Sequence, residues 1–168
     1  MAALPIVYSG DPEFRDDLLE LAAQVGNRAL IGRHYLHVGR QKWTDGTDDM
    51  PLKKIFYSLR PAAVLGWMRV NPTSVLPPMN LGQLLEESDP DPELVSATTE
   101  LLARKAVTRE LGRGTVPPAI ARFVTEEFAL ATEEYEHADP CASDESRELA
   151  SDYFRSAVAK YGGGNDLS

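Results

Sequence analysis

The sequence has few of the residues that build disulfides, metal centres and membrane spans. One cysteine, Cys141, and three histidines occur in 168 residues, which excludes an internal disulfide and a multi-cysteine zinc site. No apolar run approaches the roughly 18 residues that a membrane span needs. The opening MAALPIVYSG has no basic region ahead of a long apolar core, so no signal peptide is expected. These absences predict a soluble, cytoplasmic protein without a membrane partner.

Positive charge is scarce overall, but it is concentrated in one region. The net charge of −9 and the pI near 4.8 argue against binding to duplex DNA or to an anionic membrane. Residues 26–70 nevertheless carry a net charge of +5, against −14 for the remainder. A positive patch on a negative body favours a small anionic ligand such as a phosphate. The alternative is a set of solvated helix faces with no ligand.

Strand signals are also scarce, and helical periodicity runs through most of the chain. The pattern predicts an all-α fold of about seven helices, in a single domain over residues 1–161. The segment ALPIVYS is the one candidate for a short extended stretch, and the glycine-rich residues 162–168 should form a disordered tail. Breakers and caps place the helices at about 12–25, 28–43, 52–70, 80–87, 92–111, 117–135 and 143–161.

The third of these helices carries an unusual mixture of cations and aromatics. Lys53, Tyr57 and Arg60 recur at i, i+4 and i+7 on one stripe, with Lys54 beside them. Two cations flanking a phenol hydroxyl can grip a phosphate, because lysine supplies a point charge and arginine a bidentate fork. Pro61 should end or kink the helix just past Arg60. The alternative places Tyr57 in the core, with the basic side chains reaching solvent along it.

Other polar constellations carry less chemistry. His34 and His37 have the i, i+3 spacing of some metal ligands, but no carboxylate or cysteine nearby completes a ligand set. We expect His34 to be half-buried and hydrogen-bonded. The Asp89-Pro90-Asp91 pair lies at a helix start, where aspartate usually serves as a cap.

Several blocks of this sequence, in this order, resemble the C-terminal half of the YcgL/RlaP-type nucleotidyltransferases of the DNA polymerase β superfamily. The blocks are RHYLHVGRQKW, LKKIFYSLRPAAVLGWM, VLPPMNLGQLL and ELLARKAVTRELGRGTVPPAIARFVTEEF, within about residues 5–130. The KKIFYSLRP stretch is the most specific of them. The residues that match the family pattern are His34, Tyr35, Lys53, Lys54, Tyr57, Arg60 and Pro61, while Arg33 stands where another histidine is common.

The family's catalytic head has no counterpart here. That head carries a Gly-Ser turn and a strand with an Asp-x-Asp pair that holds two Mg²⁺ ions for nucleotidyl transfer. Ser9-Gly10 has the reverse order, and Asp89-Pro90-Asp91 has a proline at its centre. The chain begins about where the family's helical half would begin. The resemblance thus implies a helical lobe without catalytic residues or a cofactor of its own, and leaves open whether the chain is an enzyme.

Two functions follow as hypotheses. In the first, the lobe binds a nucleoside triphosphate or an RNA end through Lys53, Tyr57, Arg60 and their neighbours. A separately encoded head would then supply the catalytic carboxylates and the Mg²⁺, and would dock on an exposed apolar surface near ALPIVY, Trp43 or Trp67. In the second, the chain is a stand-alone helical interaction module that binds no nucleotide.

Overall fold

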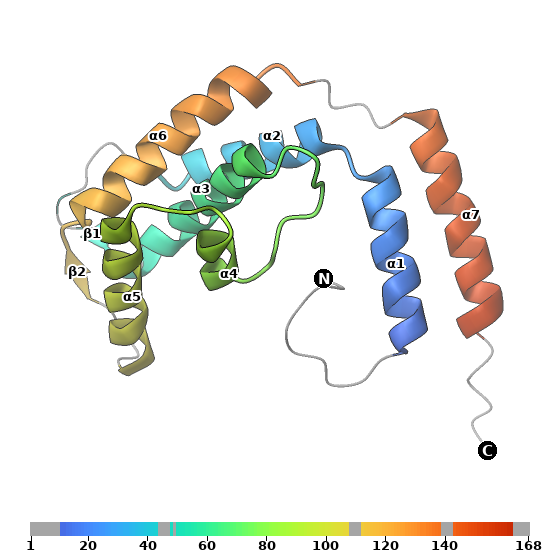
Figure 1. Cartoon of the computed structure of the whole chain (residues 1–168), viewed down its shortest axis with the longest axis horizontal. Helices are drawn as coiled ribbons and strands as arrows, with labels where there is room; N and C mark the ends of the chain where they lie inside the picture. The colour runs from blue at the N-terminus through green and yellow to red at the C-terminus, as the bar shows by residue number, and fades with distance from the viewer. Residues whose placement is uncertain (1–10, 44–47, 49, 108–111, 139–142, 163–168) are drawn as a thin grey trace.

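The computed structural model describes residues 11–43, 48, 50–107, 112–138 and 143–162. Within these residues the protein consists of seven α-helices and one short pair of strands, so the predicted all-α class is confirmed (Figure 1). The predicted N-terminal extended segment, and all of the tail except Gly162, lie outside the described residues. The helices are α1 (Pro12–Val25), α2 (Arg28–Arg40), α3 (Ile55–Val70), α4 (Leu81–Glu86), α5 (Pro92–Val107), α6 (Pro118–Tyr135) and α7 (Asp144–Tyr161).

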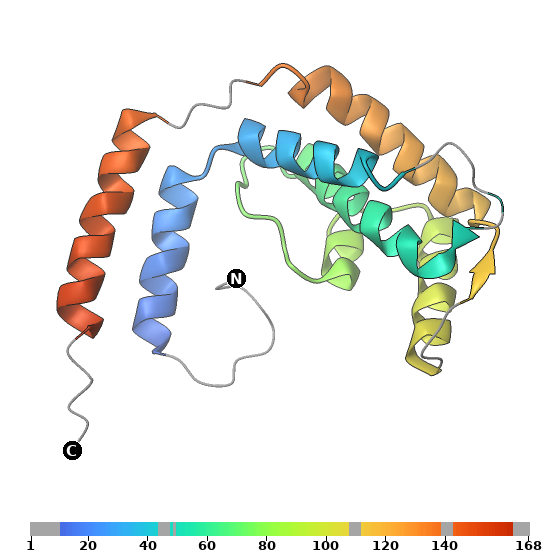
Figure 2. The same ribbon diagram turned by 180° about the vertical axis from the view of Figure 1, so that it is seen from behind.

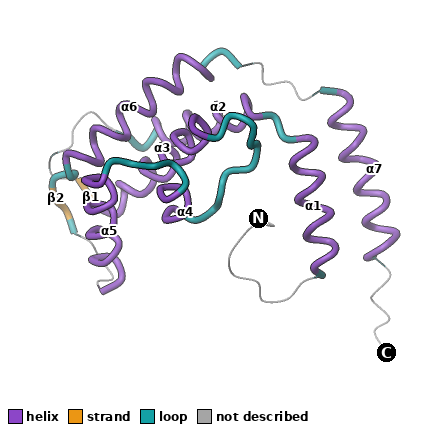
Figure 3. Tube along the Cα trace, in the orientation of Figure 1, coloured by secondary structure: helices purple, strands orange, loops and turns teal. Residues whose placement is uncertain are grey.

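The strands are a feature that the sequence pattern did not predict. β1 (Met50–Pro51) and β2 (Arg113–Gly114) pair in antiparallel register, with Met50 opposite Gly114. A 3₁₀ turn over Leu52–Lys54 then leads directly into α3. The pairing ties the start of α3 to the segment that precedes α6 (Figure 3).

Polar side chains accept hydrogen bonds from the first turns of five helices, α1, α2, α4, α5 and α7. The Asp11 carboxylate accepts hydrogen bonds from the backbone N–H groups of Glu13 and Phe14, at 2.8 and 3.2 Å. Asn80 caps α4 in the same way, and the Ser143 hydroxyl accepts from the backbone of Ser146. These bonds satisfy N–H groups that the first turn of a helix leaves without partners.

The hydrophobic core lies where α2, α3 and α6 pack together, as the views from both sides show (Figures 1 and 2). α3 is the central element, because every side chain from Pro61 to Met68 is buried. At and before the start of this helix, Leu52, Ile55 and Leu59 are also buried, and Phe56 is partly buried. Members with no exposed surface include Leu36, Ile55, Leu59, Ala62, Met68, Leu84, Ile120 and Val124.

Two glycines allow α2 to approach its neighbours closely. A Cβ atom on Gly39 would lie 2.4 Å from the Phe128 ring on α6 and 2.9 Å from the Pro61 Cβ on α3. A Cβ on Gly32 would lie 2.6 Å from the Tyr135 ring. Real Cβ atoms do not make contacts this short, so only glycine permits this packing.

The position of Pro61 corrects one part of a prediction. We expected the helix to end or kink just past Arg60; it does not end there, because α3 runs from Ile55 through Val70 with Pro61 inside it. Proline lacks an N–H group, so it cannot donate to the carbonyl of Tyr57. Pro61 is buried where α2 crosses at Gly39, and that tertiary packing keeps the helix continuous despite the lost bond.

The pair of α1 and α7 lies at the opposite end of the molecule from α5 (Figures 1 and 2). The two helices run antiparallel, since the Lys160 Nζ atom near the end of α7 lies 2.6 Å from a Glu13 carboxylate oxygen at the start of α1. The rings of Phe14 and Tyr161 also meet edge to face, with centroids 5.1 Å apart. Neither helix contributes a buried residue, so this pair is held largely by contacts at its edges. Among the described residues, no helix is long and apolar enough to cross a membrane.

Candidate functional site

The predicted cationic stripe, which runs from the 3₁₀ turn into α3, is exposed. Lys53, Lys54, Tyr57 and Arg60 all face solvent, and 59% of Tyr57 is accessible. The alternative in which Tyr57 belongs to the core is therefore wrong. Residues 52–68 contain no acidic side chain, so none from α3 itself neutralises the stripe.

Arg60 connects this stripe to the chain after α3. Its guanidinium donates a hydrogen bond to the backbone carbonyl of Met79, in the connection over residues 71–80. A guanidinium has five N–H donors in a fixed fork, so donors remain for a further acceptor. Arg60 thus both fixes the connection beside α3 and keeps its charge at the surface.

α5 adds a fourth cation beside the stripe, one that the sequence analysis did not identify. The Lys105 Nζ atom lies 4.7 Å from the centre of the Phe56 ring, in a cation–π contact between α5 and α3. Phe56 directly precedes Tyr57 on the helix. The two lysine–aromatic partners are far apart in sequence, so no local pattern could have revealed the contact.

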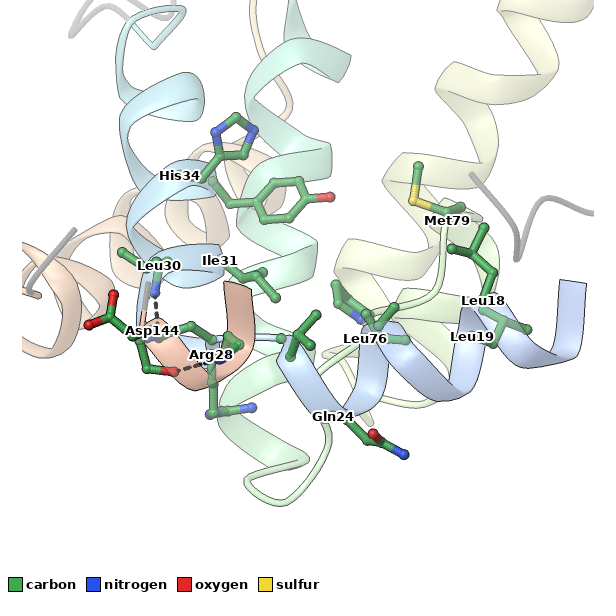
Figure 4. A pocket seen from close by; sticks show the side chains of 18 residues that line it. Leu18, Leu19, Gln24, Arg28, Leu30, Ile31, His34, Leu76, Met79 and Asp144 are labelled. Carbon is green, nitrogen blue, oxygen red and sulfur yellow. Dashed lines mark hydrogen bonds between the residues drawn. The ribbon is translucent and has the colours of Figure 1, made fainter. Parts of the chain in front are cut away.

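A separate groove of about 1220 Å³ lies between α1, α2, the connection over residues 71–80 and the start of α7. Leu18, Leu19 and Met79 lie on one side of the groove and His34 lies on the other (Figure 4). Most of its walls are apolar. The lining residues also include Ala22, Val25, Arg28, Leu30, Ile31, Tyr35, Leu76, Pro77 and Asp144.

Arg28 shapes one wall of this groove. Its guanidinium donates to the backbone carbonyls of Met68, Asn71 and Ser74, the last at 2.9 Å. These carbonyls lie at the end of α3 and the start of the connection, where helix carbonyls have no helical donors. Arg28 therefore fixes the direction in which the chain leaves α3, and its guanidinium is engaged by backbone.

The sequence-predicted residues divide between the stripe and the groove. His34 and Tyr35 line the groove, with ring centroids 5.5 Å apart in an edge-to-face contact. Lys53, Lys54, Tyr57 and Arg60 are not among the lining residues. His34 is exposed, so the expectation of a half-buried histidine is wrong. It stands on the outer flank of α2, whose core side is formed by Gly32, Leu36 and Gly39.

Trp67 was predicted near an exposed apolar surface where a head protein would dock, and this prediction is wrong. Only 5% of Trp67 is exposed, and its indole N–H donates to the Glu87 carboxylate at 2.7 Å. Hydrogen bonds from Gln83 and then Trp67 lower the pKa of Glu87. Trp43 is partly buried against the core, and the ALPIVY segment lies outside the described residues. Trp67 thus anchors α4 to α3 and presents no surface to a partner.

One carboxylate lies inside the core, on the side of α3 away from the stripe. Glu127 on α6 is 4% exposed and pairs with Arg69 at 2.6 Å. The hydrogen bond from Arg69 to Glu127 raises the pKa of the guanidinium. In the part of the chain that the structure describes, no three His, Cys, Asp or Glu side chains are grouped as metal ligands.

Comparison with known proteins places these features in a family. Residues 1–156 match the model of a family described as "RlaP: RNA repair pathway DNA polymerase beta family". The chain is also 31% identical over 97 residues to the uncharacterized protein YcgL of Bacillus subtilis (strain 168). That match covers 56% of this chain and 36% of YcgL, so it spans little more than a third of the relative. No solved structure matches the chain. Because the family model covers nearly the whole sequence, the chain belongs to the RlaP family of the DNA polymerase β group.

Proposed function

We propose that this chain is the nucleotide-binding helical lobe of a nucleotidyltransferase that acts in RNA repair, and that it is not catalytic alone. Lys53 in the 3₁₀ turn and Tyr57 and Arg60 on α3 contact the phosphates, with Lys54 adding charge. His34 and Tyr35 contribute from α2. The observation that supports this role most strongly is the exposure of all three stripe residues, in a segment over residues 52–68 that carries no acid.

The chemistry of the stripe suits a polyphosphate. Lysine and arginine form charge-assisted hydrogen bonds to phosphate oxygens, and a phenol hydroxyl can donate a further one. Lys105 lies against Phe56 and raises the local positive charge. In a protein of net charge −9, such a patch attracts a small anion, while the rest of the surface repels a long polyanion.

Catalysis would require carboxylates from elsewhere. In-line phosphoryl transfer depends on metal ions that neutralise charge on the transferring group. In our proposal, a separate head protein supplies the Asp-x-Asp pair, and Mg²⁺ binds together with the nucleoside triphosphate. The acceptor of the nucleotidyl group is an RNA end, as the description of the RlaP family suggests.

Calorimetric titration with Mg·ATP and Mg·GTP tests the binding role. We expect wild-type protein to bind, and Lys53→Ala and Arg60→Ala each to weaken affinity about tenfold, because each removes a charge-assisted bond worth roughly 1.5 kcal/mol. The matched control is Arg155→Ala, which removes an exposed cation on α7. Equal affinity in all four proteins, or no binding to any, would refute nucleotide binding by this chain.

A second candidate function is a stand-alone interaction module, and an exposed apolar strip favours it. Phe154 is 68% exposed and Val158 is 53% exposed, one turn apart on α7. Paired apolar side chains at this spacing suit a helix or groove on a partner. Under this function Phe154→Ser abolishes co-purification of one defined partner, whereas Lys53→Ala has no effect on it. Under the nucleotide-binding role, Phe154→Ser leaves Mg·ATP affinity unchanged.

A further inference from the structure

We propose that the bound nucleotide has one orientation: its base lies in the groove between α1, α2 and residues 71–80, and its phosphates extend along α3. Arg60 then contacts the phosphate next to the ribose, and Lys53 contacts the terminal phosphates. This inference rests on the nucleotide-binding role proposed above and adds the place of the base and the direction of the phosphates.

Met79 joins the two parts of this site. Its side chain lines the groove, and its carbonyl accepts the hydrogen bond from Arg60. The stripe and the groove therefore meet at one residue. A ligand that occupies both must pass beside the Arg60 guanidinium.

The direction along α3 follows from helix geometry. Arg60 is the stripe residue bonded to the groove wall, and Tyr57 and Lys53 lie progressively farther toward the start of the helix. The rise along the helix and its 3₁₀ turn places the Cα atom of Lys53 roughly 11 Å from that of Arg60. A chain of phosphates that starts at Arg60 thus proceeds past the Tyr57 hydroxyl toward Lys53.

The groove itself is poorly suited to phosphates and well suited to a base. The Arg28 guanidinium at its wall already donates to three backbone carbonyls, and the Asp144 carboxylate adds negative charge. Leu18, Leu19 and Leu76 offer apolar walls, opposite the flank of α2 that carries His34 (Figure 4). Apolar and aromatic side chains with few polar groups are typical of sites for flat organic ligands.

Three ligands separate the two halves of the site: Mg·ATP, AMP and inorganic tripolyphosphate. Each ligand is titrated into the full chain, and shifts in two-dimensional NMR spectra give dissociation constants from micromolar to millimolar. The variants are Lys53→Ala, Arg60→Ala and Leu76→Gln, with Arg155→Ala as the control. Leu76 is 39% exposed, so glutamine at this position should fold, and circular dichroism verifies that it does.

The expected pattern differs for each variant. Lys53→Ala weakens the binding of ATP and tripolyphosphate about tenfold. The affinity for AMP does not change, because AMP lacks the terminal phosphates that Lys53 would contact. Arg60→Ala lowers the affinities for ATP and AMP by similar factors. Leu76→Gln lowers the affinities for ATP and AMP and leaves the affinity for tripolyphosphate unchanged.

Other outcomes overturn the orientation, and they can be told apart from failure of nucleotide binding itself. One such outcome is that Lys53→Ala and Arg60→Ala lower the affinities for all three ligands alike, while Leu76→Gln changes none of these affinities. The stripe would then bind phosphate, but the groove would hold no base. If AMP depends on Lys53 and not on Arg60, the nucleotide runs in the reverse direction. If no ligand binds to wild-type protein, both the proposed function and the orientation are wrong.

Discussion

The two ends of this molecule are stabilised in different ways. At one end, α2, α3 and α6 bury a continuous apolar core, and two glycines bring α2 into close contact with the other helices. At the other end, α1 and α7 bury no residue fully and meet through ring edges and ion pairs. The groove is walled by both regions, because α1 and the start of α7 face α2 across it. The core region therefore fixes the cationic stripe, whereas the paired helices define the far wall of the groove.

The two regions should differ most in the free energy of unfolding that is lost when one leucine in each is truncated. We expect Leu59→Ala to lower the free energy of unfolding by about 2–5 kcal/mol, since it removes a side chain with no exposed surface and leaves a cavity. Leu149→Ala on α7, where the leucine is 39% exposed, should cost less than about 1 kcal/mol. Urea unfolding followed by circular dichroism measures both. Similar losses would show that α7 is packed as tightly as α3.

Removal of an ion pair in each region should reveal a smaller difference in the free energy of unfolding. Arg69→Met leaves the buried Glu127 carboxylate without its guanidinium and should cost about 1–3 kcal/mol, less than a wholly buried pair because Arg69 is half-exposed. Arg155→Met removes an exposed partner of Asp152 on α7 and should cost no more than about 0.5 kcal/mol. The same urea experiment compares them. An equal cost would mean that burial of Glu127 does not govern its pairing.

The smallest effect is expected between α1 and α7. Lys160 donates to both Glu13 and Asp17, at 2.6 and 3.3 Å, and the bond to Glu13 contributes most to raising the lysine's pKa. Because these side chains are exposed, salt screens their attraction. Lys160→Ala should lower the melting temperature slightly in low salt and have no effect in high salt. A loss that persists in high salt would indicate that the lysine's apolar stem, and not its charge, holds the two helices together.

Local sequence rules predicted the helices well. The Asp11 and Asn80 caps fixed the starts of α1 and α4, and the described bounds of α5 and α6 lie close to those expected. The residues chosen for the stripe are exposed, two of them in the 3₁₀ turn before α3 and two in α3 itself. Such features depend on neighbours a few residues apart, which a single sequence displays.

Features that depend on distant contacts were missed or wrongly predicted. Pro61 breaks helices in isolation, but burial beneath α2 keeps α3 continuous. Trp67 was expected at a docking surface and instead donates a hydrogen bond to Glu87, the C-cap residue of α4. The Arg60–Met79 and Lys105–Phe56 contacts join segments far apart in the chain, and no periodicity marks either. The spatial arrangement around the stripe and the groove could therefore not be derived from the sequence, and the roles of the predicted site residues stay predictions.

Amide hydrogen exchange with and without saturating Mg·ATP tests the central claim most directly, because it reports on both regions at once. We predict slower exchange over residues 53–60 and 76–79 when nucleotide binds, and unchanged exchange over residues 150–160 of α7. The Lys53→Ala/Arg60→Ala double variant should show no change in either region. Protection confined to α7, or no protection anywhere in wild-type protein, would contradict a nucleotide site on the cationic stripe of α3.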